Sequence, residues 1–190
     1  MDVALYSTIW VALALFVAAE AGKQRFSRLG AVPGWAWPVW VAGAGLCTLH
    51  IVIGFAGRHG WSHEIAVRET ARQTAAVYGV NWGGGVYVNY VFVGAWLTEA
   101  WWWRAYPSHY FSRRRAISWA LRAFYVLIIV NAAIVFAGVP GRTIGLVLVG
   151  VLLWAWRPGS DVGSSALGCA RPQTASPGNP AGTRSGRRVG

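Results

Sequence analysis

Histidine and glutamate side chains gather near one polar stretch of an otherwise apolar sequence. His50, His59 and His63 lie in or just before residues 58–85, which read RHGWSHEIAVRETARQTAAVYGVNWGGG, and Glu64 follows His63 directly. Imidazole and carboxylate groups together suit zinc, copper or iron. His50, His63 and Glu64 are therefore candidate metal ligands, although the H-E-x-x-H order of zinc proteases is absent from the sequence.

A haem is a second cofactor that these histidines would suit. Two histidines can serve as the axial ligands of a b-type haem, and His50 is the only histidine inside a predicted membrane span. His50 and a loop histidine would then belong to a redox membrane subunit. The sequence contains no C-x-x-C-H motif for covalent haem attachment.

A third interpretation of these residues needs no cofactor. At about 1.5 Å per residue, His50, Asn89 and Asn131 have similar depths in their predicted spans. Polar groups within hydrocarbon normally face a partner or a cavity, so this outer layer is expected to form an interhelical hydrogen-bond network or to line a site for a small apolar ligand. The candidate residues of the outer layer are His50, His59, His63, Glu64, Tyr87, Asn89 and Asn131.

Long apolar runs must hold these residues in place. Hydrophobic residues make up 55% of the 190 residues and charged residues 12%, whereas soluble domains carry about 25% charged residues. Because a spanning helix needs roughly 20 mainly apolar residues, the sequence predicts an all-α polytopic bundle with about five transmembrane helices. The predicted spans are residues 2–19, 35–57, 85–103, 116–138 and 139–156.

The first and last of these runs have alternatives. Residues 2–19 could be a cleaved signal peptide, but no Lys or Arg precedes the apolar run, which favours an uncleaved helix. Residues 144–156 are short by themselves and form a half-span or re-entrant segment unless residues 139–143 join them. Cys47 lies within a span and Cys169 in the tail, so no disulfide between them is expected.

Residues 62–78, between the second and third spans, are predicted to form a short amphipathic surface helix. Ser62 suits the N-cap and Glu64 lies in the first turn, where a negative charge is favourable. Gly79 then ends the helix. Residues 81–85, including a glycine triplet, are expected to turn the chain back into the membrane.

The distribution of basic residues predicts the orientation. With five spans, twelve of the 17 Lys and Arg residues fall on one side and four on the other, with Arg122 inside a span. Because Lys and Arg are retained on the cytoplasmic side, we expect a protein of a bacterial inner membrane with its N-terminus outside the cell membrane and its C-terminus in the cytoplasm. The tail, residues 157–190, is rich in Gly, Pro, Ser and Arg and is predicted to be disordered.

The net charge of +11 bears on the partners of the protein. Its basic residues are scattered over loops and the tail rather than over a folded basic domain, which argues against nucleic acid. Attraction to anionic lipid accounts for them, at about 1 kcal/mol per residue near the surface. The expected partners are the lipid bilayer, with anionic lipid at its cytoplasmic face, and a second membrane protein.

Two charged residues lie inside predicted spans. Glu99 and Arg122 are each within roughly 10 Å of the cytoplasmic end of their span. Because a charge in hydrocarbon needs a partner, we predict an ion pair between Glu99 and Arg122 on adjacent helices. A proton-coupled transporter that uses Glu99 is the alternative.

No complete set of catalytic residues is present. The sequence therefore favours a non-catalytic integral membrane protein, either a scaffold or interaction subunit or a binder of a small apolar ligand in its outer half. The alternative function is a metal-binding or haem-binding redox membrane subunit that uses His50 and His63 at the outer face.

Overall fold

The structure, a computed structural model, describes residues 2–27 and 32–157. All regular secondary structure in these ranges is helical, which confirms the predicted all-α class. Nearly all of the tail predicted over residues 157–190 lies outside the described residues.

The helices follow one another along the chain with short connections. In order they are α1 (Asp2–Ser27), α2 (Ala36–Arg58), α3 (His63–Tyr78), α4 (Gly85–Ala105), α5 (Pro107–Phe111), α6 (Arg115–Val130), the π-helical turn η1 (Asn131–Val135) and α7 (Val139–Trp156).

Three helices are long and apolar enough to cross a membrane: Val3–Phe26, Ala36–Arg58 and Arg115–Val135. Pro140–Trp156 is a shorter apolar helix. Helix α4 has 21 residues, but Glu99, Arg104 and its amphipathic Trp and Tyr side chains make it less apolar than these three. The number of five spans therefore stays a prediction.

The local signals at both ends of the surface helix appear in the structure. Ser62 Oγ accepts a hydrogen bond from the Ile65 N–H at 3.3 Å, as an N-cap does. Gly79 has φ 72° and its N–H donates to the Ala75 carbonyl at 2.9 Å. The segment predicted over residues 62–78 is thus α3.

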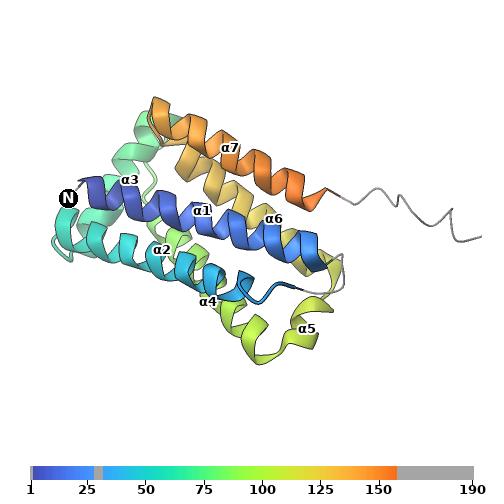
Figure 1. The fold of residues 1–190 in the computed structure, drawn as a ribbon. Coiled ribbons are helices and arrows are strands. Elements are labelled where there is room, and N and C mark those ends of the chain that lie inside the picture. Colours follow the sequence, from blue (N-terminus) through green and yellow to red (C-terminus); the bar gives the residue numbers. More distant parts are fainter. Residues whose placement is uncertain (1, 28–31, 158–190) are drawn as a thin grey trace, which may run out of the picture. The chain divides into compact units, whose positions relative to one another are not determined.

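The five long helices run lengthwise through the bundle, with α3 across one end and α5 at the other (Figure 1). Helix α1 packs most extensively on α2 and also contacts α7, while α4 contacts α2 and α3. We call the end that holds α5, the last turns of α1, α4 and α7 and the start of α6 the basic end.

Aromatic side chains fill the centre of the bundle. The Phe16 ring on α1 lies 5.0 Å from the Trp40 ring, 4.9 Å from the Trp96 ring and 5.1 Å from the Tyr125 ring, measured between centroids. These residues come from α1, α2, α4 and α6, and all four are buried. The pairs of Phe16 with Trp96 and Tyr125 are edge-to-face, and such pairs add about 0.5–1.5 kcal/mol each beyond their buried area.

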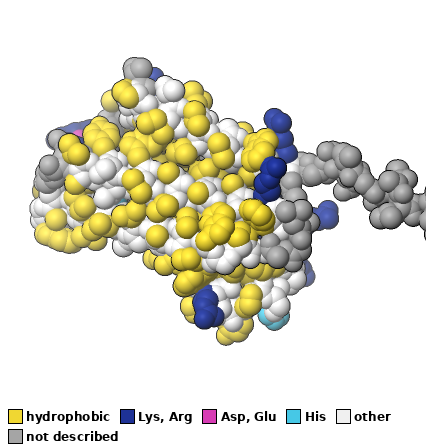
Figure 2. Space-filling model, viewed as in Figure 1, with side chains coloured by type: hydrophobic (Ala, Val, Ile, Leu, Met, Phe, Trp, Pro, Cys, Tyr) yellow, Lys and Arg dark blue, Asp and Glu magenta, His cyan; other side chains and the backbone are white. Residues whose placement is uncertain are grey.

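The surface separates apolar from basic side chains. On the face shown in Figure 2, hydrophobic side chains cover the length of the bundle, and most of the visible Lys and Arg side chains lie toward the basic end. Leu97, Trp101, Leu127, Leu146 and Leu153 are among the exposed hydrophobic residues. An apolar flank with charges at one end is the surface that a lipid bilayer requires.

Candidate functional site

The residues predicted for the outer layer make separate contacts. On α2, the His50 Nδ1 lies 3.0 Å from the Leu5 carbonyl oxygen and 3.3 Å from the Thr8 hydroxyl, so His50 joins α2 to α1. Asn131 accepts a hydrogen bond from the Tyr78 hydroxyl at 2.6 Å, which joins η1 to α3. The structure does not bring His50 and Asn131 into one hydrogen-bonded network.

His63 docks the surface helix onto α4. Its Nε2 lies 3.1 Å from the Tyr87 hydroxyl and its Nδ1 lies 3.3 Å from the Tyr90 hydroxyl. The Phe55 ring of α2 stacks on the imidazole at 6.4 Å between centroids. These contacts use both ring nitrogens of His63, so a structural role in docking α3 explains this histidine and no bound ligand is needed.

The remaining outer residues lie elsewhere. The His59 ring lies 5.6 Å from the Phe55 ring, and Glu64 pairs with Arg68 at 3.0 Å on the exposed face of α3. Asn89 is exposed. The proposed ligand set of His50, His63 and Glu64 is not assembled, because the described residues hold no group of three or more His, Cys, Asp or Glu side chains that could bind a metal ion.

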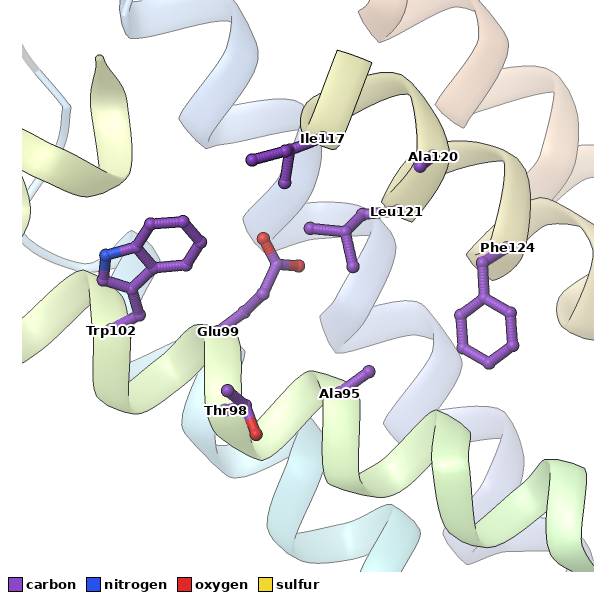
Figure 3. A pocket seen from close by; sticks show the side chains of 8 residues that line it. All are labelled: Ala95, Thr98, Glu99, Trp102, Ile117, Ala120, Leu121 and Phe124. Carbon is purple, nitrogen blue, oxygen red and sulfur yellow. The ribbon is translucent and has the colours of Figure 1, made fainter. Parts of the chain in front are cut away.

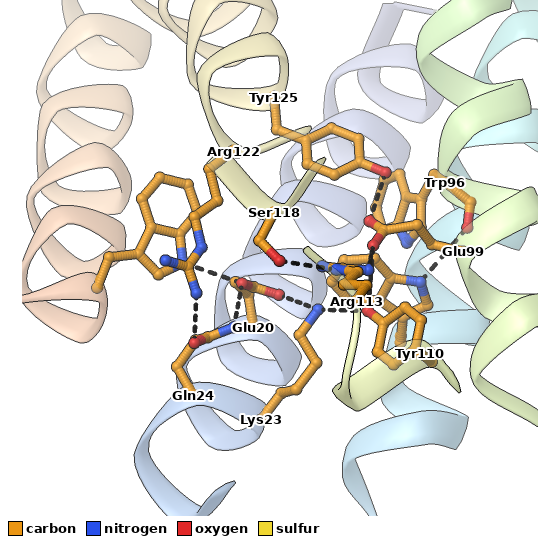
Figure 4. A network of polar contacts seen from close by, with 12 residues as sticks. Glu20, Lys23, Gln24, Trp96, Glu99, Tyr110, Arg113, Ser118, Arg122 and Tyr125 are labelled. Carbon is orange, nitrogen blue, oxygen red and sulfur yellow. Dashed lines mark hydrogen bonds and ion pairs between the residues drawn. The ribbon is translucent and has the colours of Figure 1, made fainter. Parts of the chain in front are cut away.

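A buried ionic cluster occupies the basic end instead (Figure 4). On α1, Glu20 and Lys23 form an ion pair in which both side chains are less than 5% exposed, at 4% and 3%. The Lys23 ammonium also donates to the Tyr110 hydroxyl at 2.8 Å and lies 4.2 Å from the centroid of the Trp40 ring. Trp156 on α7 donates to Glu20 at 2.9 Å, so the cluster ties α7 to α1.

Glu99 is the second anion of this cluster. Its Oε1 accepts from the Arg113 guanidinium and, at 3.2 Å, from the Tyr110 hydroxyl. Its Oε2 accepts from the Tyr125 hydroxyl at 2.8 Å. Donors from α5, α6 and the segment between them therefore converge on one carboxylate of α4.

The arginine that pairs with Glu99 is not the predicted one. Arg122 donates to the Gln24 side chain of α1, while Glu99 forms its ion pair with Arg113. The prediction of a Glu99–Arg122 pair is corrected to Glu99–Arg113. The physical reason is that α5 turns the chain back at the basic end, which brings Arg113 under α4, whereas Arg122 lies on the side of α6 that faces α1.

The positions of Tyr110 and Arg113 keep both side chains in their donor forms. Burial raises the pKa of the Tyr110 hydroxyl, so this hydroxyl stays protonated and can donate to Glu99. Burial alone would lower the pKa of Arg113, but Tyr110 and Glu99 raise it by more. The cluster brings together two acidic side chains, Glu20 and Glu99, and three basic ones, Lys23, Arg113 and Arg122.

A groove between α4 and α6 leads to Glu99 (Figure 3). Its volume is about 540 Å³, within the roughly 300–1,000 Å³ that ligand sites occupy. The Glu99 carboxylate points from α4 toward Ile117 and Leu121 of α6. The lining is apolar apart from Thr98 and Glu99, and it consists of Ala95, Thr98, Glu99, Trp102, Ile117, Ala120, Leu121 and Phe124.

Four residues of the buried cluster are not among the predicted site residues: Glu20, Lys23, Tyr110 and Arg113. Glu20 and Lys23 are four and seven residues after the buried Phe16, and this helical spacing places them on the buried face of α1. This spacing predicts that both side chains are buried if the first helix continues past residue 19. Arg113 offered no such signal, because it lies in an arginine run outside any periodic segment.

Comparisons of the chain with protein-family models, with curated proteins and with solved structures give no match.

Proposed function

We propose that this chain is a small, non-catalytic integral membrane protein that binds a chain-like apolar ligand from the bilayer. The observation that carries the proposal is the groove between α4 and α6, which is lined almost entirely by apolar side chains. Its outer edge is formed by exposed residues such as Ile117 and Ala120. A ligand could therefore enter sideways from the hydrocarbon without leaving the membrane.

The buried cluster supports binding rather than catalysis at this site. A catalytic carboxylate must be able to exchange a proton or contact a substrate, whereas Glu99 is already bonded by Arg113, Tyr110 and Tyr125. These contacts fix the floor of the groove. The ligand site expected in the outer half is accordingly proposed at the basic half, where the groove lies.

In the proposed topology α4 and α7 complete five spans, the N-terminus is outside and the basic end faces the cytoplasm of a bacterial cell. Three apolar helices support the membrane location. The basic end holds seven of the Lys and Arg residues of the described chain, which supports the orientation by the preference of these residues for the cytoplasmic side. These residues are Lys23, Arg25, Arg104, Arg113, Arg114, Arg115 and Arg157.

Photocrosslinking of a neutral chain tests the binding site. The full-length protein in nanodiscs of zwitterionic lipid is mixed with a long-chain alcohol that carries a diazirine in its chain, irradiated, digested and analysed by mass spectrometry. We expect labels within residues 95–102 and 117–124, which hold the lining of the groove.

A matched pair of tryptophan substitutions separates the groove from general lipid contact. Ala120→Trp fills the groove and should reduce labelling of residues 95–102 by about tenfold, since a tryptophan occupies much of a small-ligand site. Ala123→Trp makes the same change at an exposed position of α6 that does not line the groove. Equal labelling in the two variants would overturn the proposed function.

A further inference from the structure

The groove has two chemically different ends. Ala95 and Phe124 lie at one end, and Trp102 and Ile117 at the other (Figure 3). Trp102 is three residues before the end of α4 and Ala95 is ten before it, so at about 1.5 Å per residue they lie roughly 5 Å and 15 Å from the basic end. A chain in the groove would therefore have one terminus near the basic end and the other deep in the bundle.

The terminus near the basic end would lie in a positive field. Arg113 stacks near Trp102, with its guanidinium carbon 5.9 Å from the ring centroid, and the exposed Arg114 follows directly. Arg114 is the N-cap residue of α6, and Ile117 lies in the first turn of the same helix. The groove thus ends beside the Arg113 guanidinium, and the next residue of the chain is the exposed Arg114.

Among the described residues, the acidic side chains near this end are paired with other cations and leave the charge of Arg114 uncompensated. Glu99 is paired with Arg113 and its side chain is only 4% exposed, while Glu20 is paired with Lys23. Among the described residues these are the acidic ones of the basic end. A cationic headgroup would have to displace Arg113 from Glu99, whereas an anionic headgroup can add to Arg114 without breaking a contact.

We infer that the ligand is an anionic single-chain lipid of the bilayer, with its acyl chain along Ala95, Leu121 and Phe124 and its headgroup at Arg114. Guanidinium groups bind carboxylate and phosphate oxygens through charge-assisted hydrogen bonds. This inference rests on the proposed function, because it names the chemical class of the ligand that the groove takes. It also gives the ligand a direction, with the headgroup at the basic end.

Three probes that differ only in headgroup test the inference. A fatty acid with a diazirine in its chain is compared with the alcohol and the primary amine of the same chain, each titrated at pH 8 into the full-length protein in zwitterionic nanodiscs. The readout is the half-saturating concentration for labelling residues 95–102 and 117–124. We expect the acid to bind at least about fivefold more tightly than the alcohol, and the amine to bind more weakly than the alcohol.

Two arginine variants locate the headgroup. Arg114→Gln should weaken binding of the acid by about fivefold and leave binding of the alcohol unchanged. Arg104→Gln removes the same charge from the same end, but Arg104 is two residues after Trp102 and so lies about 200° around α4, away from the groove. This control should affect the acid much less than Arg114→Gln does.

The outcomes distinguish the inference from the function on which it rests. Equal labelling by all three probes, or preference for the amine, would overturn the anionic class while the groove remains a binding site. Equal effects of Arg104→Gln and Arg114→Gln would show general surface attraction and overturn the headgroup position. Failure of every probe to label the groove would refute the proposed function itself.

Discussion

Glu99 of α4 and Arg113 of the segment between α5 and α6 form an ion pair in which both side chains are more than nine-tenths buried, with 4% and 8% of their surfaces exposed. Arg113 also donates from Nε to Ser118 at 2.9 Å, and Glu99 accepts from two tyrosines. Burial of two charges is costly unless their remaining hydrogen-bonding groups are satisfied. The additional donors and acceptors meet that condition, so the pair can stabilise the basic end.

Removal of one partner should destabilise the protein strongly. Glu99→Gln leaves Arg113 buried without its counter-charge, and an uncompensated buried charge costs about 3–5 kcal/mol. The unfolding free energy is measured by titrating sodium dodecyl sulfate into mixed micelles and following the helical circular dichroism. Glu64→Gln breaks an exposed pair with Arg68, and it should change the unfolding free energy by at most about 1 kcal/mol.

The double variant Glu99→Gln with Arg113→Gln checks the cause of this loss. If the cost comes from an unpaired charge, the double variant should lose less than the two single variants added together. Strict additivity of the two losses, or a Glu99→Gln variant as stable as Glu64→Gln, would contradict the assigned role of the pair.

Substitution of Lys23 should destabilise the protein as strongly as substitution of Glu99, because Lys23 forms a buried ion pair with Glu20 of the same helix. Lys23→Leu leaves Glu20 with hydrogen bonds from Gln24 and Trp156 but without its cation, so we expect a loss of about 3 kcal/mol or more in the same titration. Arg25→Leu, two residues later and exposed, should cost about 1 kcal/mol or less.

A compensating substitution makes the Lys23 prediction specific to charge. Glu20→Leu combined with Lys23→Leu replaces the buried pair by apolar side chains, which is often neutral or stabilising. The double variant should therefore be more stable than Lys23→Leu alone. A double variant that unfolds more easily than the single one would show that packing, and not the charge of Lys23, is what the cluster requires.

The helices could be predicted from the sequence where their signals come from neighbouring residues in the chain. Apolar runs predict the long helices, and Ser62 and Gly79 predict the ends of α3 because capping depends only on neighbouring residues. The sequence predicts the first span to end at residue 19, because the apolar run stops before the charged residues Glu20 and Lys23. In the structure α1 continues to Ser27, since these two charges satisfy one another within the bundle.

Only some residues of the candidate site could be predicted from the sequence. Glu99 can be predicted as a site residue, because a charge in an apolar run requires a partner. Its actual partner depends on α5, a helix of five residues, which is too short to leave a periodic pattern. The same holds for the groove, which arises where α4 and α6 are held apart by the large rings of Phe92, Phe124 and Tyr125. Such separations depend on three-dimensional packing rather than on any one segment.

Because α7 packs closely on η1, substitution of one glycine of α7 by alanine should destabilise the protein. A Cβ at Gly145 would lie 2.4 Å from the Ala133 carbonyl oxygen, whereas a Cβ at Gly150 of the same helix would meet nothing within 4 Å. Gly145→Ala should therefore cost about 1–3 kcal/mol through overpacking. Gly150→Ala should be neutral or stabilise by up to about 1 kcal/mol, because alanine is the better helix former.

The two glycine variants are compared by the thermal midpoint of unfolding in detergent, at equal protein concentration. They share the helix, the substitution and the added methyl group, so general effects on membrane insertion cancel. A Gly145→Ala protein that melts at or above the midpoint of Gly150→Ala would show that α7 does not approach η1 as closely as described.

Single cysteines should report the proposed topology directly. In a background with Cys47 and Cys169 replaced by alanine, Arg72→Cys places a thiol on the exposed face of α3, and His109→Cys places one on the exposed part of α5. An impermeant maleimide added to intact cells should label Arg72→Cys, and should label His109→Cys only after the membrane is permeabilised. The opposite pattern would reverse the orientation. Labelling of both thiols, or of neither, in intact cells would mean that α4, the helix between them, does not cross the bilayer. The groove between α4 and α6 would then lack the lateral access to lipid on which its proposed ligand depends.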